Sequence, residues 1–250
     1  MVTPQVRLNP EQQAAVEHTE GPLLVLAGAG TGKTRVITAR IGHLLRNGIL
    51  PEQVLAMTFT NKAAREMRER ISDMVGKERA GFITMGTFHS FCARLLRRHG
   101  EIVGLPKQYT ICDSSDQLAT VRAALRELRV GEEKMKPSTA LSRISLWKNQ
   151  LVTPDQALDM EGDDQDELVA RAYRKYEASL RRSRVVDFDD LLLMTLQVMQ
   201  KDEPLRARLQ DQFRYLLVDE YQDTNGPQYE ILRFLSATHR NLCVVGDDDQ

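Results

Sequence analysis

A loop of small residues that ends in a lysine and a threonine is the first feature of this sequence that could do chemistry. The loop follows an apolar run, Leu23 to Leu26, and ends at Lys33 and Thr34. Backbone N–H groups in such a loop converge on phosphate oxygens, and the start of the following helix favours an anion. We expect Lys33 to reach the outer phosphates of a nucleoside triphosphate and the Thr34 hydroxyl to bind Mg²⁺. The residues predicted to surround the phosphates are Ala27, Gly28, Ala29, Gly30, Thr31, Gly32, Lys33 and Thr34.

One position departs from the strict P-loop pattern. Ala27 stands where that pattern has glycine, which is compatible with the function only if the backbone there needs no positive φ. A glycine-rich turn without a ligand is the alternative interpretation. The strand pattern before the loop and the helical pattern after it favour the P-loop.

A pair of carboxylates is the second chemical feature. Asp219 and Glu220 come directly after another apolar run, Tyr215 to Val218. A buried parallel strand places both at the carboxyl edge of its sheet, where a P-loop also lies. We expect Asp219 to hold Mg²⁺, directly or through water, and Glu220 to polarise the attacking water as general base. Such pairs are common after apolar runs, so this interpretation depends on the P-loop upstream.

The composition is that of a globular protein without strong charge bias. Apolar residues make up 42% of the 250 residues and charged residues 28%, with a net charge of −1. Any nucleic-acid surface must therefore come from local basic clusters, such as those within 94–99 and 171–184. The three cysteines lack metal-site spacing, and no signal peptide or membrane span is evident. We expect a cytoplasmic protein.

Short apolar runs alternate with segments of helical period, which predicts an α/β fold with a parallel sheet. The predicted strands are Leu23 to Leu26, Val54 to Thr58, Phe82 to Met85, Tyr215 to Val218 and Leu242 to Val245. Between the third and fourth runs the periodicity is helical throughout. We therefore expect a discontinuous α/β domain at about residues 1–110 and 186–250, interrupted by an all-helical domain at about residues 111–185.

Seven segments in this order resemble the amino-terminal half of the UvrD/Rep/PcrA-type DNA helicases, which are superfamily 1A motors. They are Leu8 to Gln12, Ala27 to Arg35, Thr58 to Ala64, Gly86 to His89, Val186 to Asp190, Val218 to Thr224 and Val245 to Gln250. The resemblance extends over essentially the whole chain. It implies a RecA-like P-loop NTPase domain 1A, a helical domain 1B, and the cofactors ATP and Mg²⁺.

Two residues near the P-loop are expected to contact the nucleotide. The side-chain amide of Gln12 can donate and accept together, which matches the N6/N7 edge of adenine and would prefer ATP over GTP. Gln12 could instead be an ordinary exposed residue near a helix start. Arg35 follows the P-loop threonine and could contact the nucleotide or lie on the helix surface.

Residues after two of the predicted strands are the candidates for binding single-stranded DNA. Hydroxyl and amide groups at a helix start suit phosphates, and an aromatic ring offers a stacking surface for a base. Core packing is the alternative for Phe59, and a capping or buried role is the alternative for His89. The candidates, strengthened by the resemblance, are Thr58, Phe59, Thr60, Asn61, Lys62, Thr87, Phe88 and His89.

The remaining helicase segments imply coupling and structural roles. By resemblance, Gln222 and Asp223 link the nucleotide state to the DNA site, and Gln250 senses the γ-phosphate, completing a catalytic set with Lys33, Asp219 and Glu220. Asp187 followed by acidic residues is equally typical of a helix N-cap, so this segment is left out of the catalytic set.

The whole resemblance implies the amino-terminal half of an ATP-dependent helicase that moves 3′ to 5′ on single-stranded DNA and at single-strand/duplex junctions, in repair or replication. Its second RecA-like domain does not occur in this sequence, which stops inside a motif. We therefore expect this polypeptide alone to bind ATP weakly, hydrolyse it poorly and not unwind duplexes. A P-loop ATPase that is not a helicase, or a catalytically silent module for ATP and DNA, are the alternatives.

Overall fold

The structure is a computed structural model that describes residues 8–28 and 30–247, and it divides into two compact units. The α/β unit comprises Met1–Phe91, Asp202–Thr224 and Gln228–Gln250. The helical unit comprises Cys92–Lys201 and Asn225–Pro227.

A five-stranded, wholly parallel sheet forms the centre of the α/β unit, in the order β1-β7-β6-β2-β3. Its strands are β1 (Leu23–Leu26), β2 (Val54–Thr58), β3 (Thr84–Thr87), β6 (Tyr215–Val218) and β7 (Leu242–Gly246). The predicted α/β fold with a parallel sheet is thereby confirmed. The third strand begins two residues later than predicted, because Phe82 ends the short helix α4 (Lys77–Phe82) instead of starting the strand.

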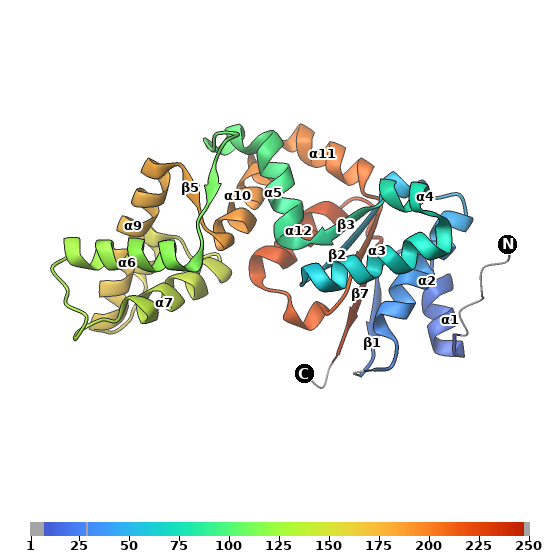
Figure 1. Cartoon of the computed structure of the whole chain (residues 1–250), viewed down its shortest axis with the longest axis horizontal. Helices are drawn as coiled ribbons and strands as arrows, with labels where there is room; N and C mark the ends of the chain where they lie inside the picture. Colours follow the sequence, from blue (N-terminus) through green and yellow to red (C-terminus); the bar gives the residue numbers. More distant parts are fainter. Residues whose placement is uncertain (1–7, 29, 248–250) are drawn as a thin grey trace. The chain divides into compact units, whose positions relative to one another are not determined.

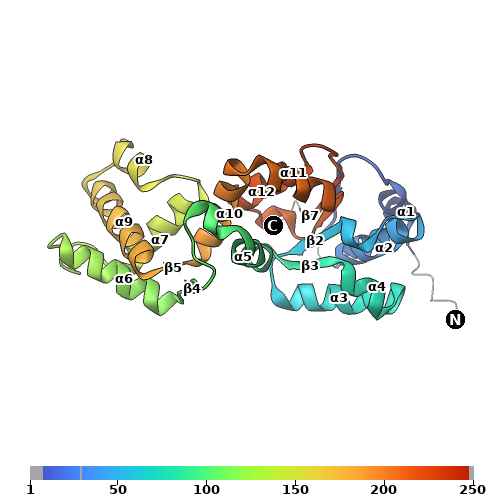
Figure 2. The same cartoon turned by 90° about the horizontal axis from the view of Figure 1, so that it is seen from above.

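Helices cover both faces of this sheet. Figure 2 shows α3 (Asn61–Val75) and α4 on one side and α11 (Glu203–Gln212) and α12 (Gly226–Ser236) on the other. The core on the first side joins α2 (Lys33–Arg46) and α3 to the strands through residues such as Ile37, Ile41 and Met67. The helix α1 (Pro10–Glu17) packs on α2 in a smaller apolar cluster with Ala15 and Val16.

The first strand is not the fully buried strand that its apolar sequence predicts. Leu24 and Leu26 are 58% and 57% exposed, whereas Leu23 and Val25 pack against the core. The reason is the strand order, because β1 lies at the edge of the sheet and the described residues cover only one of its faces. A continuous apolar run cannot reveal which strand will be at the edge.

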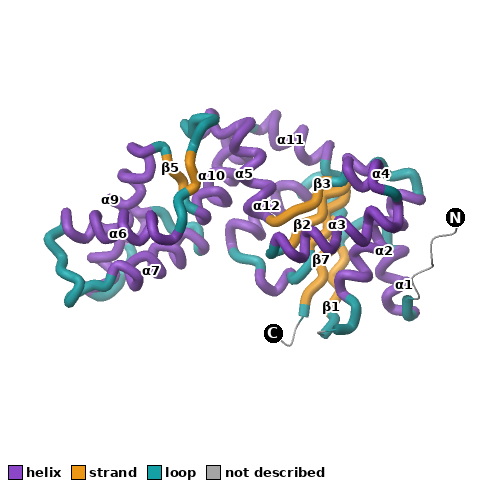
Figure 3. The backbone as a smooth tube through the Cα atoms, viewed as in Figure 1, coloured by secondary structure: helices purple, strands orange, loops and turns teal. Residues whose placement is uncertain are grey.

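The helical unit confirms the helical periodicity of the middle of the sequence (Figures 1 and 3). Its main helices are α6 (Ser114–Glu127), α7 (Pro137–Asn149), α8 (Pro154–Asp159), α9 (Asp164–Ser183) and α10 (Phe188–Lys201). A core with Trp147 and Tyr176 at its centre joins α6, α7 and α9. Helix α5 (Phe88–His99) begins in the α/β unit and ends in this one.

Two very short strands mark where the chain enters and leaves the helical segment. β4 (Thr110–Ile111) and β5 (Val185–Val186) pair in parallel, at the positions where the sequence predicts the domain boundaries. The compact helical unit nevertheless extends beyond this ladder, from Cys92 to Lys201. The assignment of residues 92–110 and 186–201 to the ATP-binding domain stays a prediction. Within the described part of the chain, no helix has the length and apolar character needed to cross a membrane.

A buried lysine organises the polar centre of the helical unit. The Lys148 ammonium lies 2.6 Å from a Glu177 oxygen, 2.7 Å from an Asp187 oxygen and 2.6 Å from an Asp190 oxygen. Burial disfavours the charged amine, but the surrounding carboxylates outweigh that effect and raise the pKa of Lys148 well above its usual value. Burial also favours the neutral form of a carboxyl group, and it raises the pKa of Asp190 to about 7.

The same cluster explains the acidic segment that starts α10. The Asp187 carboxylate accepts a hydrogen bond from the Asp190 N–H at 2.8 Å, and the Asp187 N–H donates to the Asp190 carboxylate at 3.2 Å. This reciprocal pair confirms the N-cap interpretation of Asp187. Lys148 therefore ties α7 to α9 and to the start of α10.

Replacing Lys148 with methionine should destabilise the helical unit strongly, since the buried Asp187 and Asp190 and the mostly buried Glu177 lose their only ammonium contact among the described residues. Breaking a buried ion pair in this way costs about 3–5 kcal/mol. Urea unfolding followed by circular dichroism measures the change. Lys175→Met, which removes an exposed pair with Glu127, is the matched control and should shift the midpoint little. An equally small shift for Lys148→Met would contradict the structural role assigned to the cluster.

Candidate nucleotide site at the carboxyl edge of the sheet

The parallel sheet brings the predicted site residues to one edge. The P-loop follows β1, Asp247 follows β7, Asp219 follows β6, Phe59 follows β2 and Phe88 follows β3. Because all five strands run in the same direction, these segments emerge side by side in the order of the strands. The first three strand ends carry the candidate nucleotide site, and the last two carry the candidate DNA residues.

The P-loop has the backbone that its sequence predicts. Ala27 does not adopt a positive φ, and its N–H donates to the Gly246 carbonyl at 3.0 Å. Gly30 and Gly32 do adopt positive φ values, of 76° and 95°, which explains why glycine is needed at both. Gly32 directly precedes α2 and provides no side-chain cap, so the first N–H groups of the helix are left for an anion. Ala29 lies outside the described residues.

Lys33 lies between two carboxylates that come from different strand ends. Its ammonium is 3.0 Å from an Asp247 oxygen and 3.3 Å from a Glu220 oxygen, and only 8% of the residue is exposed. Burial acts to lower the pKa of Lys33, but its hydrogen bonds to Asp247 and Glu220 outweigh burial and raise that pKa. The raised pKa keeps the lysine charged, which the predicted contact with phosphates requires.

Gln222 closes a ring of contacts around this lysine. Its side-chain N–H donates to the Glu220 carboxylate at 2.8 Å, and its side-chain oxygen accepts from the Asp247 N–H at 3.0 Å. Glu220 itself takes the left-handed backbone conformation, with φ of 52°. The P-loop, the end of β6 and the end of β7 are thus joined through Lys33, Glu220, Gln222 and Asp247.

Thr34 and Asp219 form the second polar pair of the site. The Thr34 hydroxyl donates to the Asp219 carboxylate at 3.1 Å, and Asp219 is 3% exposed. Burial raises the pKa of Asp219. A hydroxyl and a carboxylate that converge in this way supply the oxygen ligands that Mg²⁺ prefers, so these two residues fit the predicted metal. The Asp219 N–H also donates to the Met57 carbonyl of β2 at 3.0 Å.

Gln12 reaches the P-loop from α1. Its side-chain N–H donates to the Thr31 carbonyl at 3.0 Å, and its side-chain oxygen accepts from the Asn9 N–H at 3.1 Å. These bonds distinguish Gln12 from an ordinary exposed residue. Its contact with adenine stays a prediction, and so does a nucleotide contact of Arg35, whose side chain is exposed on α2.

The candidate DNA residues lie on two adjacent strand ends, since Thr58 and Thr87 are register partners in β2 and β3. The rings of Phe59 and Phe88 meet with centroids 5.6 Å apart. Phe88 is only 1% exposed, so here its ring supports Phe59 and offers no face to a base. Thr58 and Thr87 are also buried, whereas Phe59 and His89 are partly exposed and Thr60, Asn61 and Lys62 are exposed.

Hydroxyl groups in these segments hold the starts of two helices. The Thr60 hydroxyl accepts from the Ala63 N–H at 3.1 Å, and the Thr87 hydroxyl accepts from the Ser90 N–H at 3.1 Å. The DNA contacts of both segments stay predictions. The candidates whose side chains are at least partly accessible are Phe59, Thr60, Asn61, Lys62 and His89.

Asp247 is the site residue without a role in the sequence-based prediction. It belongs to the segment Val245 to Gln250, in which the resemblance to helicases predicts a γ-phosphate contact for Gln250 alone. The signal available in the sequence was its position directly after a strand, which places it at the same edge as Asp219. Gln250 lies outside the described residues.

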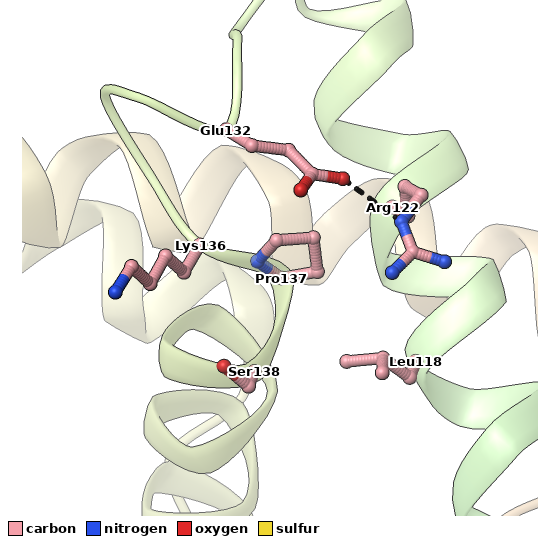
Figure 4. A pocket seen from close by; sticks show the side chains of 6 residues that line it. All are labelled: Leu118, Arg122, Glu132, Lys136, Pro137 and Ser138. Atoms are coloured by element: carbon pink, nitrogen blue, oxygen red, sulfur yellow. Dashed lines mark hydrogen bonds and ion pairs between the residues drawn. The ribbon is translucent and has the colours of Figure 1, made fainter.

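A separate hollow of about 310 Å³ lies on the helical unit, between α6 and the start of α7 (Figure 4). It is lined by Leu118, Arg122, Glu132, Lys136, Pro137 and Ser138. Figure 4 shows Arg122 directed toward Glu132, and the two form an ion pair at 3.0 Å. The hollow therefore lacks the combination of lysine, hydroxyl and paired carboxylates found at the sheet edge.

Comparison with known proteins agrees with this geometry. The family model of the UvrD/REP helicase N-terminal domain matches residues 8–250. The chain is 46% identical over 244 residues to the ATP-dependent DNA helicase PcrA of Leuconostoc citreum and 44% identical to that of Staphylococcus aureus strain Mu50. Each alignment covers 97% of this chain and 33% of the relative, so the chain spans about a third of the length of these relatives.

Replacing Asp247 with asparagine should lower the pKa of Lys33, because it removes one of the two carboxylates that stabilise the ammonium. A pH titration of the lysine side-chain carbon resonances by NMR measures this pKa. Asp223→Asn, an exposed change in the neighbouring segment, should leave it unaltered. An unchanged Lys33 pKa in Asp247→Asn would show that the pair does not determine the charge of this lysine.

Proposed function

This chain belongs to the UvrD/REP helicase N-terminal domain family, and we propose that it is the part of a 3′ to 5′ DNA helicase that binds ATP and single-stranded DNA. The observation that carries the proposal is the meeting of Lys33, Thr34, Asp219 and Glu220 at one edge of the sheet. We further propose that the complete protein works in the cytoplasm in DNA repair or replication.

The geometry supports a distinct role for each of these four residues. Lys33 exchanges its carboxylate partners for the outer phosphates of ATP, while the P-loop N–H groups hold the remaining phosphate oxygens. Thr34 and Asp219 hold Mg²⁺, which when bound neutralises charge that develops on the phosphates. Glu220, kept in place by Gln222, accepts a proton from the attacking water.

The arrangement of the strands supports coupling between ATP and DNA. The Asp219 N–H donates to the Met57 carbonyl, and Met57 is two residues before Phe59. A shift of the carboxylates during hydrolysis is thereby transmitted to the strand end that carries Phe59, Asn61 and Lys62. Phe59 stacks on a base in this proposal, and the basic and amide groups contact the phosphates.

The chain spans about a third of the length of its relatives, and we propose that the complete activity also involves the rest of the motor. The proposed partner is a second RecA-like half that closes over the nucleotide and supplies arginines to the transition state. Such arginines accelerate hydrolysis by about 10³–10⁵. We therefore propose that the 250-residue chain alone binds ATP weakly, hydrolyses it slowly and does not unwind duplexes or their junctions.

Lys33→Ala should abolish binding of ATP with Mg²⁺ to this chain, because the ammonium is the side-chain cation at the proposed phosphate site. Equilibrium titration with a fluorescent ATP analogue measures binding directly and does not depend on hydrolysis. Lys77→Ala, an exposed lysine at the start of α4, is the matched control and should bind like the unmodified chain. Equal affinity of Lys33→Ala and the unmodified chain would refute the assignment of the P-loop.

Phe59→Ala should weaken binding of a labelled single-stranded oligonucleotide by about 5- to 160-fold, the effect of losing one base–aromatic stack worth about 1–3 kcal/mol. Fluorescence anisotropy at fixed salt measures it. Phe82→Ala removes an exposed ring at the opposite end of β3 and should have no effect. Loss of ATP binding together with DNA binding would indicate misfolding, and an unchanged DNA affinity would remove Phe59 from the proposed interface.

A further inference from the structure

The α/β unit buries an arginine that has no role in the proposed chemistry. Arg40 lies in α2 and is 2% exposed. Among the described residues, no aspartate or glutamate forms an ion pair with it, and its Nε has no hydrogen-bond partner. Burying a charge without a counterion is costly, so the contacts that Arg40 does make must be important to the structure.

All of its hydrogen bonds go to backbone carbonyls at one place, the end of α1. Nη1 donates to the Ala15 carbonyl at 2.9 Å and also to the His18 carbonyl, and Nη2 donates to the Thr19 carbonyl at 3.2 Å. The last carbonyls of a helix lack partners within the helix and carry its negative dipole end. Arg40 therefore acts as a cationic cap that fixes the end of α1 to α2.

Apart from Arg40, α1 is attached by a small apolar cluster with Val36 and Ala39 of α2 and by the contact of Gln12 with the P-loop. The helix has eight residues, and Ala15 and Val16 are its only buried residues. Isolated helices of this length are not stable in water, so the position of α1 depends on its attachment to the rest of the unit. Arg40 supplies the polar contacts at the carboxyl end of α1.

The other end of α1 carries Gln12. Asn9 caps the helix, and the Gln12 side chain bonds both to Asn9 and to the Thr31 carbonyl of the P-loop. The Gln12 amide nitrogen also lies only 3.2 Å from the position that a Cβ on Gly32 would take. A small movement of α1 would therefore separate Gln12 from the loop.

We infer that Arg40 is a positioning residue for nucleotide recognition, which anchors α1 so that Gln12 is held beside the P-loop and can distinguish adenine from guanine. The inference rests on the proposed function, in which this loop binds ATP and Gln12 reads the base. Arg40 does not touch the nucleotide. Its effect is expected in base preference, which a general loss of folded protein does not change.

The test compares the affinities of this chain for ribose-labelled fluorescent ATP and GTP. Arg40→Met should reduce the ratio of ATP affinity to GTP affinity by about tenfold, and Gln12→Ala should reduce it similarly. Adding Arg40→Met to Gln12→Ala should reduce the ratio no further, because both changes remove the same base contact. Arg46→Met, an exposed arginine in the same helix, is the matched control and should leave the ratio unchanged.

Arg40→Lys is a milder variant that separates loss of the anchor from misfolding. Lysine keeps the positive charge but has a single nitrogen to donate to the three carbonyls. A folded Arg40→Lys chain, verified by its circular dichroism and thermal midpoint, should show an intermediate ratio.

An unchanged ratio in folded Arg40→Met or Arg40→Lys would overturn the inference, as would a further reduction in the double variant. Equal binding of ATP and GTP by the unmodified chain would overturn it while leaving nucleotide binding intact. If neither nucleotide binds, the proposed function fails and the inference fails with it.

Discussion

The contact of the Lys33 ammonium with the carboxylates of Asp247 and Glu220 is the interaction on which the site depends. It joins residues that are far apart in the sequence and follow three different strands, β1, β7 and β6. Without a ligand, the carboxylates stabilise a lysine that burial would otherwise tend to neutralise. The same contact therefore preserves the charge that the proposed function requires, and in that proposal the phosphates of ATP replace the two carboxylates.

The order of the strands determines which strand ends are neighbours. Because β6 lies between β7 and β2, the carboxylate end of β6 touches the nucleotide residues on one side and the strand leading to Phe59 on the other. Gln222 and the Asp219 N–H provide the connecting hydrogen bonds. The proposed coupling between ATP and DNA needs such adjacency, and the parallel sheet supplies it.

Three buried cationic side chains are stabilised by different kinds of partner. Lys33 is paired with carboxylates that a ligand could replace, Lys148 is enclosed by three acidic groups that tie helices together, and Arg40 bonds to carbonyls at a helix end. The kind of partner determines the role that each buried cation can have. An exchangeable pair suits a binding site, an enclosed cluster suits a structural centre, and a set of carbonyl bonds suits the anchoring of a helix.

The sequence by itself determined the α/β class, the parallel strands, the helical middle and the P-loop backbone, because glycine content and apolar periodicity act through local geometry. Ala27 and Asp187 behave as their local chemistry predicts. Only the tertiary structure decided that β1 is an edge strand, that Phe88 is buried beneath Phe59, and that Asp247 and Arg40 have partners remote in sequence. These features depend on strand order and on helix packing, which bring distant residues together and leave no periodic signal in the chain.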